Sequence, residues 1–276
     1  MSTTATTLVS VIISSYQQER ALKLVLAALG ASVTDSMEVV IADDGSEPTM
    51  AEQLAGEITA YPFPIRWCWQ EDRGFRKSRA LDRAVMMTRS PLLVFLDADC
   101  IPQRDLVEIY RQRWQPGEFL TGGVIFMSDG FSARLDPQKV ADGLHEHCLA
   151  PLQRALQWRR RFSDFLSRDR QLERPRLLGG NFAVCRELFD RVDGFDQVFH
   201  HFGKEDSDIR NRMRHAGARG KSLVNVARAF HLGESHAPST DRATLPRSYY
   251  IPAGQNPLAR RGCSKVVPEK RDRSSD

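Results

Sequence analysis

An apolar run that ends in two acids occupies residues 92–99, with the sequence Leu-Leu-Val-Phe-Leu-Asp-Ala-Asp. A short, continuously apolar run of this kind is typical of a strand buried on both faces of a parallel sheet. Similar runs stand earlier in the chain, at residues 8–14, 37–42 and 65–69. The segments between the runs have the apolar spacing of amphipathic helices, at residues 19–31, 50–58 and 77–88. This alternation predicts βαβ units and an α/β fold whose mostly parallel sheet is flanked by helices.

The pattern changes after residue 99. Helical spacing is found at residues 104–115, 186–192 and 206–216, and most of 137–170 is also expected to be helical. Strands are expected at residues 119–126 and within 221–230. No periodicity follows residue 233, where Pro, Ser, Arg and Gly dominate. We therefore expect a C-terminal tail, residues 236–276, that is poorly ordered or wraps the surface.

The composition is that of a soluble globular protein, with 41% hydrophobic and 27% charged residues among 276. These values exclude collagenous and wholly disordered chains. The sequence has no apolar run of about 20 residues that could span a bilayer, and its first apolar run lacks the basic start of a signal peptide. Five scattered cysteines without CxxC spacing argue against a disulfide framework or a structural zinc site. A cytoplasmic protein is expected, and the net charge of +4 favours anionic partners.

Acids follow two of the predicted strands, Asp43 and Asp44 in one case and Asp97 and Asp99 in the other. Ligands of open parallel sheets bind at the carboxyl ends of the strands. In an extended D-x-D the two carboxylates point the same way, which suits a hard divalent cation and, through it, phosphate oxygens. The alternative is that these acids only cap the helices that follow.

Residues 72–79 form a turn into a helix and carry four basic side chains, Arg73, Arg76, Lys77 and Arg79. A helix N-terminus binds anions through its free N–H groups, so this turn is a candidate diphosphate site. A solvated helix start is the alternative.

A carboxylate cluster opens a later helix, at Glu205, Asp206 and Asp208. Crowded carboxylates can raise one pKa far enough for general-base catalysis, although acids in a first helical turn are also ordinary dipole partners. His231 ends another predicted strand, and opposite Asp99 it is a candidate metal ligand. His231 and His236 do not form H-E-x-x-H, which excludes a zinc-protease motif.

These segments resemble a known family. Four of them are similar to the nucleotide-binding half of family 2 inverting glycosyltransferases. They are residues 9–16, 38–46, 74–84 and 94–102. Those enzymes have the GT-A fold, which contains a Rossmann-like sheet. Residues 179–182 and 194–208 resemble the C-terminal region of galactosyltransferase-type enzymes. The resemblance implies a GT-A domain over residues 1–235, with a nucleotide-sugar-binding half at 8–102 and a partly helical acceptor and catalytic half at 103–235.

The resemblance also implies residue roles. Nucleotide-sugar contacts would come from the strand ends and the basic turn: Ser14, Tyr16, Asp43, Asp44, Arg73, Arg79 and Asp97. Asp99 would be the direct ligand to Mn²⁺ or Mg²⁺, and His231 a second ligand near the diphosphate. Asp206 would be the catalytic base, and acceptor contacts would come from Gly180, Asn181 and Glu205. Asp82 departs from the family, where many relatives have Asn, and no Q-x-x-R-W-type motif of processive synthases is present.

The implied function is inverting, metal-dependent transfer of a sugar from a nucleotide-sugar, with UDP-sugar expected, to a hydroxyl of a glycan or lipid-linked acceptor in bacterial cell-surface polysaccharide synthesis. A carboxylate would take the proton of the attacking hydroxyl while the cation stabilises the leaving diphosphate. A sugar-nucleotide pyrophosphorylase would need a Gly-rich loop after the first strand, where residues 14–18 contain no glycine. A non-catalytic nucleotide-sugar-binding protein on the same fold is a second alternative. A role in nucleic-acid binding is not expected, because no reader motif is present.

An arginine-rich stretch, residues 154–176, contains eight arginines interleaved with Trp158, Phe162 and Phe165. One hypothesis places this stretch against an anionic membrane, where it would make the protein peripheral at the inner face and near a lipid-linked acceptor. The alternative is a helix that packs on the catalytic domain while its arginines stay solvated.

Overall fold

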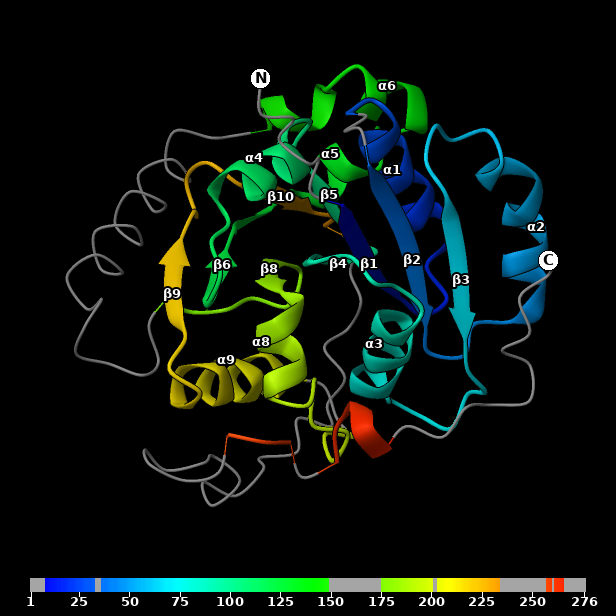
Figure 1. Ribbon diagram of the computed structural model, residues 1–276. Coiled ribbons are helices and arrows are strands. Elements are labelled where there is room, and N and C mark those ends of the chain that lie inside the picture. Colours follow the sequence, from blue (N-terminus) through cyan, green and yellow to red (C-terminus); the bar gives the residue numbers. More distant parts are fainter. Residues whose placement is uncertain are drawn as a thin grey trace, which may run out of the picture.

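A seven-stranded sheet forms the centre of the computed structural model, which describes residues 8–32, 36–148, 175–200, 203–233, 257–259 and 261–265 (Figure 1). The strands follow the order β3-β2-β1-β4-β8-β6-β9. Their bounds are Ile65–Trp69 (β3), Met37–Asp43 (β2), Val9–Ser15 (β1), Leu92–Asp97 (β4), Asn181–Cys185 (β8), Glu118–Thr121 (β6) and Arg219–Ser222 (β9). The first four are mutually parallel, and β8 is antiparallel to its two neighbours. The prediction of an α/β fold with a mostly parallel sheet is confirmed.

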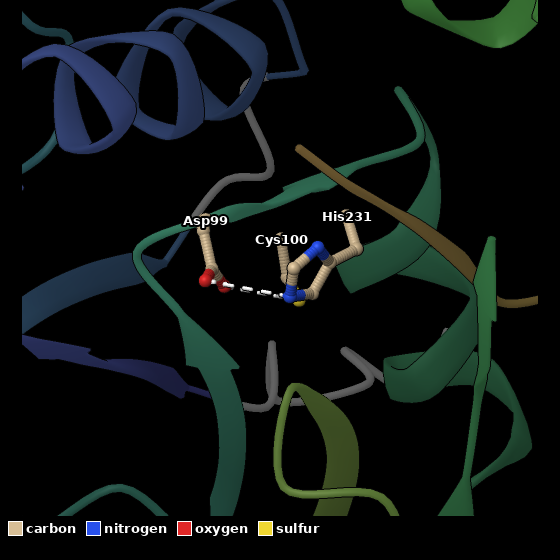
Figure 2. A group of neighbouring side chains, drawn as sticks. All are labelled: Asp99, Cys100 and His231. Carbon is tan, nitrogen blue, oxygen red and sulfur yellow. Dashed lines mark hydrogen bonds and ion pairs between the residues drawn. The ribbon is translucent and has the colours of Figure 1, made fainter. Parts of the chain in front are cut away.

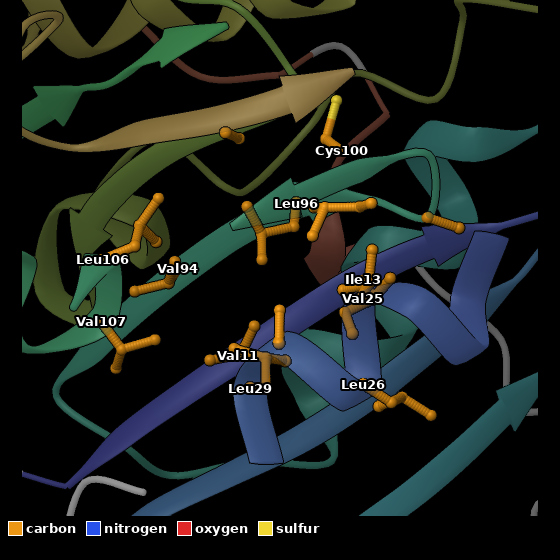
Figure 3. Packing of buried hydrophobic residues seen from close by; sticks show 14 of the residues in the cluster. Val11, Ile13, Val25, Leu26, Leu29, Val94, Leu96, Cys100, Leu106 and Val107 are labelled. Carbon is orange, nitrogen blue, oxygen red and sulfur yellow. The ribbon is translucent and has the colours of Figure 1, made fainter. Parts of the chain in front are cut away.

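Helices cover both faces of the parallel half. Helix α1 (Glu19–Gly30) buries its apolar side on one face, where Val25 and Leu29 join Val11 and Leu96 in one core (Figure 3). On the other face, helix α3 (Lys77–Met86) packs in a second core that includes Ile12 of β1. Alternate residues of each strand therefore enter different cores, which is why the strand sequences are continuously apolar. Each fully buried aliphatic side chain contributes about 1.5–3 kcal/mol to folding.

Six further helices are described besides α1 and α3. They are α2 (Pro48–Ile58), α4 (Leu106–Arg113), α5 (Asp129–Ser132), α6 (Pro137–Ala141), α8 (Arg186–Arg191) and α9 (Glu205–His215), with short 3-10 turns at Leu144–His147 and Cys263–Lys265. Of the stretch 137–170 that is predicted to be mostly helical, residues 137–148 are described, and α6 and the turn Leu144–His147 cover most of them. The two helices are separated at Gly143, which has a φ of +86°, and the rest of the stretch lies outside the described residues. Most of the arginine-rich stretch 154–176 lies outside the described residues. No described helix is long and apolar enough to cross a membrane.

A smaller sheet lies beside the large one, with the order β5-β10-β7. Its strands are Cys100–Pro102 (β5), Arg228–His231 (β10) and Gly123–Phe126 (β7). The single strand predicted over 119–126 is therefore wrong: the chain forms β6 and β7 in different sheets, with Gly122 between them. A Cβ at Gly122 would lie 2.2 Å from Nδ2 of Asn181, so only glycine fits where the chain changes sheets.

Asn181 of β8 joins the two sheets. Its Nδ2 donates to the carbonyl oxygens of Gly123 at 2.9 Å and Ala227 at 3.1 Å, beside strands of the small sheet. Its Oδ1 accepts from the hydroxyl of Tyr110 on α4 at 2.7 Å. The side chain is fully buried, and both ends of its amide are used in hydrogen bonds within the protein.

Only two short pieces of the tail 236–276 are described, and both lie on the domain. The backbone N–H of Ala259 donates to Val192 O at 3.1 Å, and that of Cys263 donates to Asp193 O at 3.0 Å. These contacts agree with a tail that wraps the surface, while the state of its other residues stays a prediction.

We predict that Asn181→Leu lowers the free energy of unfolding by about 3 kcal/mol, because it removes three buried hydrogen bonds worth about 1 kcal/mol each. Urea denaturation followed by circular dichroism measures the change. Gln138→Leu, at an exposed position of α6, is the control and should shift stability by no more than about 0.5 kcal/mol. Equal effects for both variants would contradict the bridging role of Asn181.

Candidate active site

A cleft of about 480 Å³ opens at the carboxyl ends of β1, β2 and β4. The chain order of the strands reverses here, because β1 lies between β2 and β4, and such a reversal is where α/β sheets bind ligands. The cleft is lined by Ser14, Ser15, Tyr16, Gln17, Gln18, Ala42, Asp44, Asp72, Gly74, Phe75, Lys77, Asp97 and Asp99.

Asp97 is the better-anchored acid of the D-x-D. The register of β1 on β4 places Ser14 directly beside it, and Ser14 Oγ donates to Asp97 Oδ1 at 2.5 Å. Lys77 Nζ, from the first turn of α3, also reaches Asp97 Oδ1 at 2.5 Å. Burial alone would raise the pKa of Asp97, but the Lys77 ammonium and these hydrogen bonds keep it below its ordinary value. Asp97 is therefore an ionised, positioned group.

Asp99 lies opposite His231, as the sequence predicts. The distance from Asp99 Oδ2 to His231 Nε2 is 3.4 Å, and Gln18 Nε2 also lies 3.4 Å from Oδ2 (Figure 2). Burial and the negative charge of Asp97 raise the pKa of Asp99. The other ring nitrogen of His231 lies 2.7 Å from the Leu232 carbonyl oxygen. Since a carbonyl only accepts, that nitrogen carries the proton, and Nε2 is free to face a cation.

This donor set fits a divalent cation. Asp99, Cys100 and His231 each offer a ligand atom, and these atoms all lie within 4.8 Å of one another. They come together because β5 and β10 are paired with Cys100 opposite His231, while the Leu232 N–H donates to the Asp99 carbonyl at 2.8 Å. Carboxylate and imidazole ligands on a fixed backbone are the usual components of such sites.

Asp206 approaches the cleft from α9 and contacts a glycine turn. The Gly179 N–H donates to Asp206 Oδ2 at 2.9 Å. A Cβ on Gly179 would lie 2.5 Å from Asp206 Oδ1, and one on Gly180 would lie 2.6 Å from Cys100 Sγ and 3.4 Å from Asp97 Oδ2. The Gly179–Gly180 turn is thus in close contact with Asp206 at residue 179 and with the D-x-D segment at residue 180.

Asp206 has the electrostatics of a general base. Burial, and then the neighbouring Glu205 carboxylate, raise the pKa of Asp206 to about 8. Burial likewise raises the pKa of Glu205, whose Oε2 is buried without a hydrogen-bond partner among the described residues. Asp208, the third acid of the cluster, is paired instead with buried Arg212 at 2.7 Å. Of the three, Asp206 and Glu205 belong to the site, and Asp208 serves the packing of α9.

Lys77 is a site residue that the sequence did not single out from its basic neighbours. Burial would lower its pKa, but the surrounding carboxylates of Asp97, Asp206 and Glu205 raise it on balance, so the side chain is a cation. The first-turn position on α3 was a signal, but four basic residues shared that region. Only the packing of α3 against the sheet decides which one enters the site.

Two of the residues that were predicted to contact the nucleotide-sugar lie outside the cleft. Arg73 pairs with Glu71 on the surface, and Arg79 donates to Gln70 at 2.6 Å; neither lines the cleft. Of the four basic side chains of the turn, Lys77 is the one that lines the cleft. The side chains of a turn point in different directions, and the roles of Arg73 and Arg79 in phosphate binding stay predictions.

The two acids at the end of β2, Asp43 and Asp44, have different surroundings. Asp44 lines the cleft and accepts hydrogen bonds from Gln70 Nε2 at 2.5 Å and from the Arg76 N–H at 2.7 Å; burial raises its pKa to about 6. Asp43 is fully buried, and its carboxylate accepts from the Gly45 and Ser46 N–H groups and from Trp67 Nε1. Asp43 therefore stabilises the turn, and only Asp44 remains a candidate donor contact.

The structure also shows where the other residues predicted to form the site lie. Ser14 and Tyr16 line the cleft, and the exposed Tyr16 hydroxyl donates to Asp72 Oδ2 at 3.0 Å. Gly180 borders the site through its backbone. The prediction that Asn181 contacts the acceptor is wrong, because both ends of its amide make hydrogen bonds within the protein and are not available to an acceptor.

Comparison with known proteins identifies the family of this chain. The model of the family described as glycosyl transferase family 2 matches residues 10–193. The chain belongs to this family. A second model, described as the N-terminal domain of galactosyltransferase, matches residues 160–235 of this family 2 protein. The two matches together span the cleft, the glycine turn, Asp206 and His231, as the resemblance in the sequence implied.

Similar proteins synthesise or transfer sugars. The chain is 25% identical over 241 residues to a chondroitin synthase of Pasteurella multocida (strain Pm70), covering 80% of this chain and 24% of the relative. It is 26% identical over 225 residues to a validoxylamine A glucosyltransferase of Streptomyces hygroscopicus subsp. limoneus, covering 76% of this chain and 48% of the relative. The chain thus spans a quarter to a half of the length of these two relatives.

Solved structures agree on the fold. A Pyrobaculum calidifontis mannosyltransferase in complex with GDP-Man and Mn²⁺ superposes with a TM-score of 0.55 at 19% identity, covering 85% of this chain and 59% of that one. S. aureus TarS 1–349 in complex with UDP-GlcNAc superposes with a TM-score of 0.58 at 15% identity, covering 82% and 59%. The fold is the GT-A fold, as the resemblance implied.

We predict that Glu205→Gln lowers the pKa of Asp206 from about 8, because it removes the neighbouring negative charge. Titration of the ¹³C-labelled Asp206 carboxyl group by NMR measures the shift. Glu187→Gln, an exposed acid on α8, should leave that pKa unchanged. A pKa for Asp206 that does not respond to the charge at 205 would contradict the site's electrostatics.

Proposed function

We propose that this protein is an inverting, metal-dependent glycosyltransferase that moves a sugar from a nucleotide-sugar to an acceptor hydroxyl. The observation that carries the proposal is that two unlike groups meet at the Gly179–Gly180 turn: a carboxylate with a raised pKa, Asp206, and a cation-binding set that includes Cys100. Membership in family 2 supports the reaction class.

The donor occupies the cleft in this proposal. Tyr16 and Asp44 would contact the nucleoside, and Ser14 holds Asp97 in place at the deeper end. Lys77 supplies positive charge where the diphosphate would lie. We favour UDP as the nucleotide, while the named neighbours bind UDP-GlcNAc in one case and GDP-Man in the other.

Asp99 and His231 would hold the divalent cation, Mn²⁺ or Mg²⁺. A bound cation would offset the negative charge that develops on the leaving diphosphate. The Asp97 carboxylate, which Ser14 and Lys77 hold in place, would add negative charge near such a cation.

The acceptor hydroxyl would approach from the side of Asp206. A hydroxyl is a poor nucleophile, so Asp206 Oδ1 would take its proton as the oxygen attacks the anomeric carbon. Gly179 N–H holds the other carboxylate oxygen and orients the group. Attack from one side and departure of the diphosphate from the other give inversion at the anomeric carbon. Glu205 is the proposed neighbouring acceptor contact.

The acceptor itself is a further part of the proposal. We propose a glycan or a lipid-linked glycan of the bacterial cell surface, since one relative is named a chondroitin synthase. The protein would work in the cytoplasm, with peripheral contact to the anionic inner face of the membrane through residues 154–176. That contact rests on the arginines of the sequence alone.

Asp99→Ala is expected to abolish the part of nucleotide affinity that depends on metal, because it removes the carboxylate that faces His231. Isothermal titration calorimetry with UDP, with and without Mn²⁺, measures this affinity. Asp142→Ala, at the end of α6, is the control and should bind as the wild type does. Metal-dependent UDP affinity that persists in Asp99→Ala would remove Asp99 as a ligand.

Asp206→Asn should keep nucleotide affinity and lower kcat by about 10²-fold or more, the scale of the loss of a general base. In the wild type, kcat/KM should rise with pH through about 8, because the base works only when deprotonated. Steady-state kinetics with a screened nucleotide-sugar and acceptor measure both effects. Near-normal turnover in Asp206→Asn would move the base to Glu205, and absence of any transfer by the wild type would favour the non-catalytic binding alternative.

A further inference from the structure

Cys100 has no task in the proposed function, yet its thiol lies at the cation-binding set. The Sγ atom is 3.5 Å from Asp99 Oδ1, and the residue is paired with His231 across β5 and β10. In Figure 2 the sulfur lies behind the imidazole, next to the ring nitrogen that faces Asp99. A cation held by Asp99 and His231 would therefore have a sulfur atom within reach.

The three ligand atoms are close enough for one ion. In a tetrahedral zinc site two ligand atoms lie about 3.3–3.6 Å apart, given a Zn–S length of about 2.3 Å and Zn–N or Zn–O lengths of about 2.0–2.2 Å. The Asp99 carboxylate already lies 3.4 Å from His231 Nε2 and 3.5 Å from Cys100 Sγ. All three ligand atoms lie within 4.8 Å of one another, so side-chain movements of about an ångström would complete the site.

The thiol is also held where it is. Cys100 is only 1% exposed, and its sulfur lies against the Gly179–Gly180 turn, where even a Cβ on Gly180 would approach it to 2.6 Å. Strand pairing fixes the backbone of Cys100 opposite His231. A ligand that is positioned before the ion arrives loses little conformational entropy on binding.

We propose that Cys100 is a third protein ligand of the cation, and that the site consequently prefers a thiophilic ion such as Zn²⁺ or Co²⁺ to Mn²⁺ or Mg²⁺. A carboxylate, an imidazole and a thiolate form a mixed donor set of the kind that selects zinc, whereas magnesium and manganese are held mainly by oxygen. On binding, the thiol proton passes to solvent and a sulfur–metal bond forms, with no change of oxidation state. Three protein ligands leave a position for a phosphate oxygen.

This proposal rests on the proposed function for the location of the cation, but its test reads the metal and not the transfer reaction. Co²⁺ is the probe, because a cobalt–thiolate bond gives a charge-transfer band in the near ultraviolet. The full-length protein is titrated with CoCl₂, alone and with UDP, and binding is followed in parallel by calorimetry. Competition with Zn²⁺ and Mn²⁺ then gives the relative affinities.

The wild type should show the charge-transfer band and bind Zn²⁺ more tightly than Mn²⁺. Cys100→Ser should lose the band and about 100-fold or more of the Zn²⁺ affinity, the upper end of the loss seen when even an outer partner of a metal ligand is removed. Its Mn²⁺ affinity should change little. Cys148→Ser, a half-buried cysteine outside the cation-binding set, is the matched control and should keep the band.

Two results would overturn the proposal in different ways. Calorimetric Co²⁺ binding without the band, or a band that survives in Cys100→Ser, would leave Asp99 and His231 as ligands and remove Cys100. Absence of binding of any of the three ions, with or without UDP, would remove the cation from the proposed function as well. Circular dichroism of Cys100→Ser establishes that a lost band does not come from unfolding.

Discussion

The ammonium group of Lys77 is the one interaction on which the site depends. Asp97 pairs with it at 2.5 Å, and the carboxylates of Asp206 and Glu205 also act on it electrostatically. Without this cation, the mutual repulsion of the three carboxylates and the cost of their burial would favour protonation or a more open arrangement. The Lys77 charge holds the pKa of Asp97 below its ordinary value, whereas burial and the Glu205 charge outweigh it at Asp206 and raise that pKa. One charge thus acts on two acids with opposite requirements.

Two sheets and one glycine turn set the distances around that charge. Parallel pairing of β1 and β4 places Ser14 beside Asp97, and the β5–β10 pairing places Cys100 opposite His231. Asn181 ties the large sheet to the small one through two hydrogen bonds and to Tyr110 of α4 through a third. In the Gly179–Gly180 turn directly before it, Gly179 leaves room for Asp206 and Gly180 for Cys100. The backbone next to the site is consequently rigid where a displacement of an ångström would matter most.

The donor half of the site was the more predictable half. Ser14, Asp44, Asp97 and Asp99 stand at the ends of strands that the apolar runs reveal, and ends of parallel strands meet at one edge of a sheet. The acceptor half was less predictable. Asn181 has a side chain that could bind a ligand, but its amide makes hydrogen bonds within the protein. Asp43 likewise accepts hydrogen bonds from the backbone of a turn. A polar side chain in a motif does not reveal whether its partner is a substrate or a neighbouring backbone group.

The sequence by itself determined the α/β class, the parallel half of the sheet and the D-x-D at a strand end. These features follow from periodicity and from the position of acids after strands, which are local properties of the chain. Only the tertiary structure decided that Lys77 lines the cleft while Arg73 and Arg79 do not, and that residues 119–126 divide between two sheets. It also decided that the Cys100 thiol lies with Asp99 and His231. Each of these depends on which groups distant in the sequence are brought into contact, and side-chain direction at a turn or a sheet junction is set by that packing.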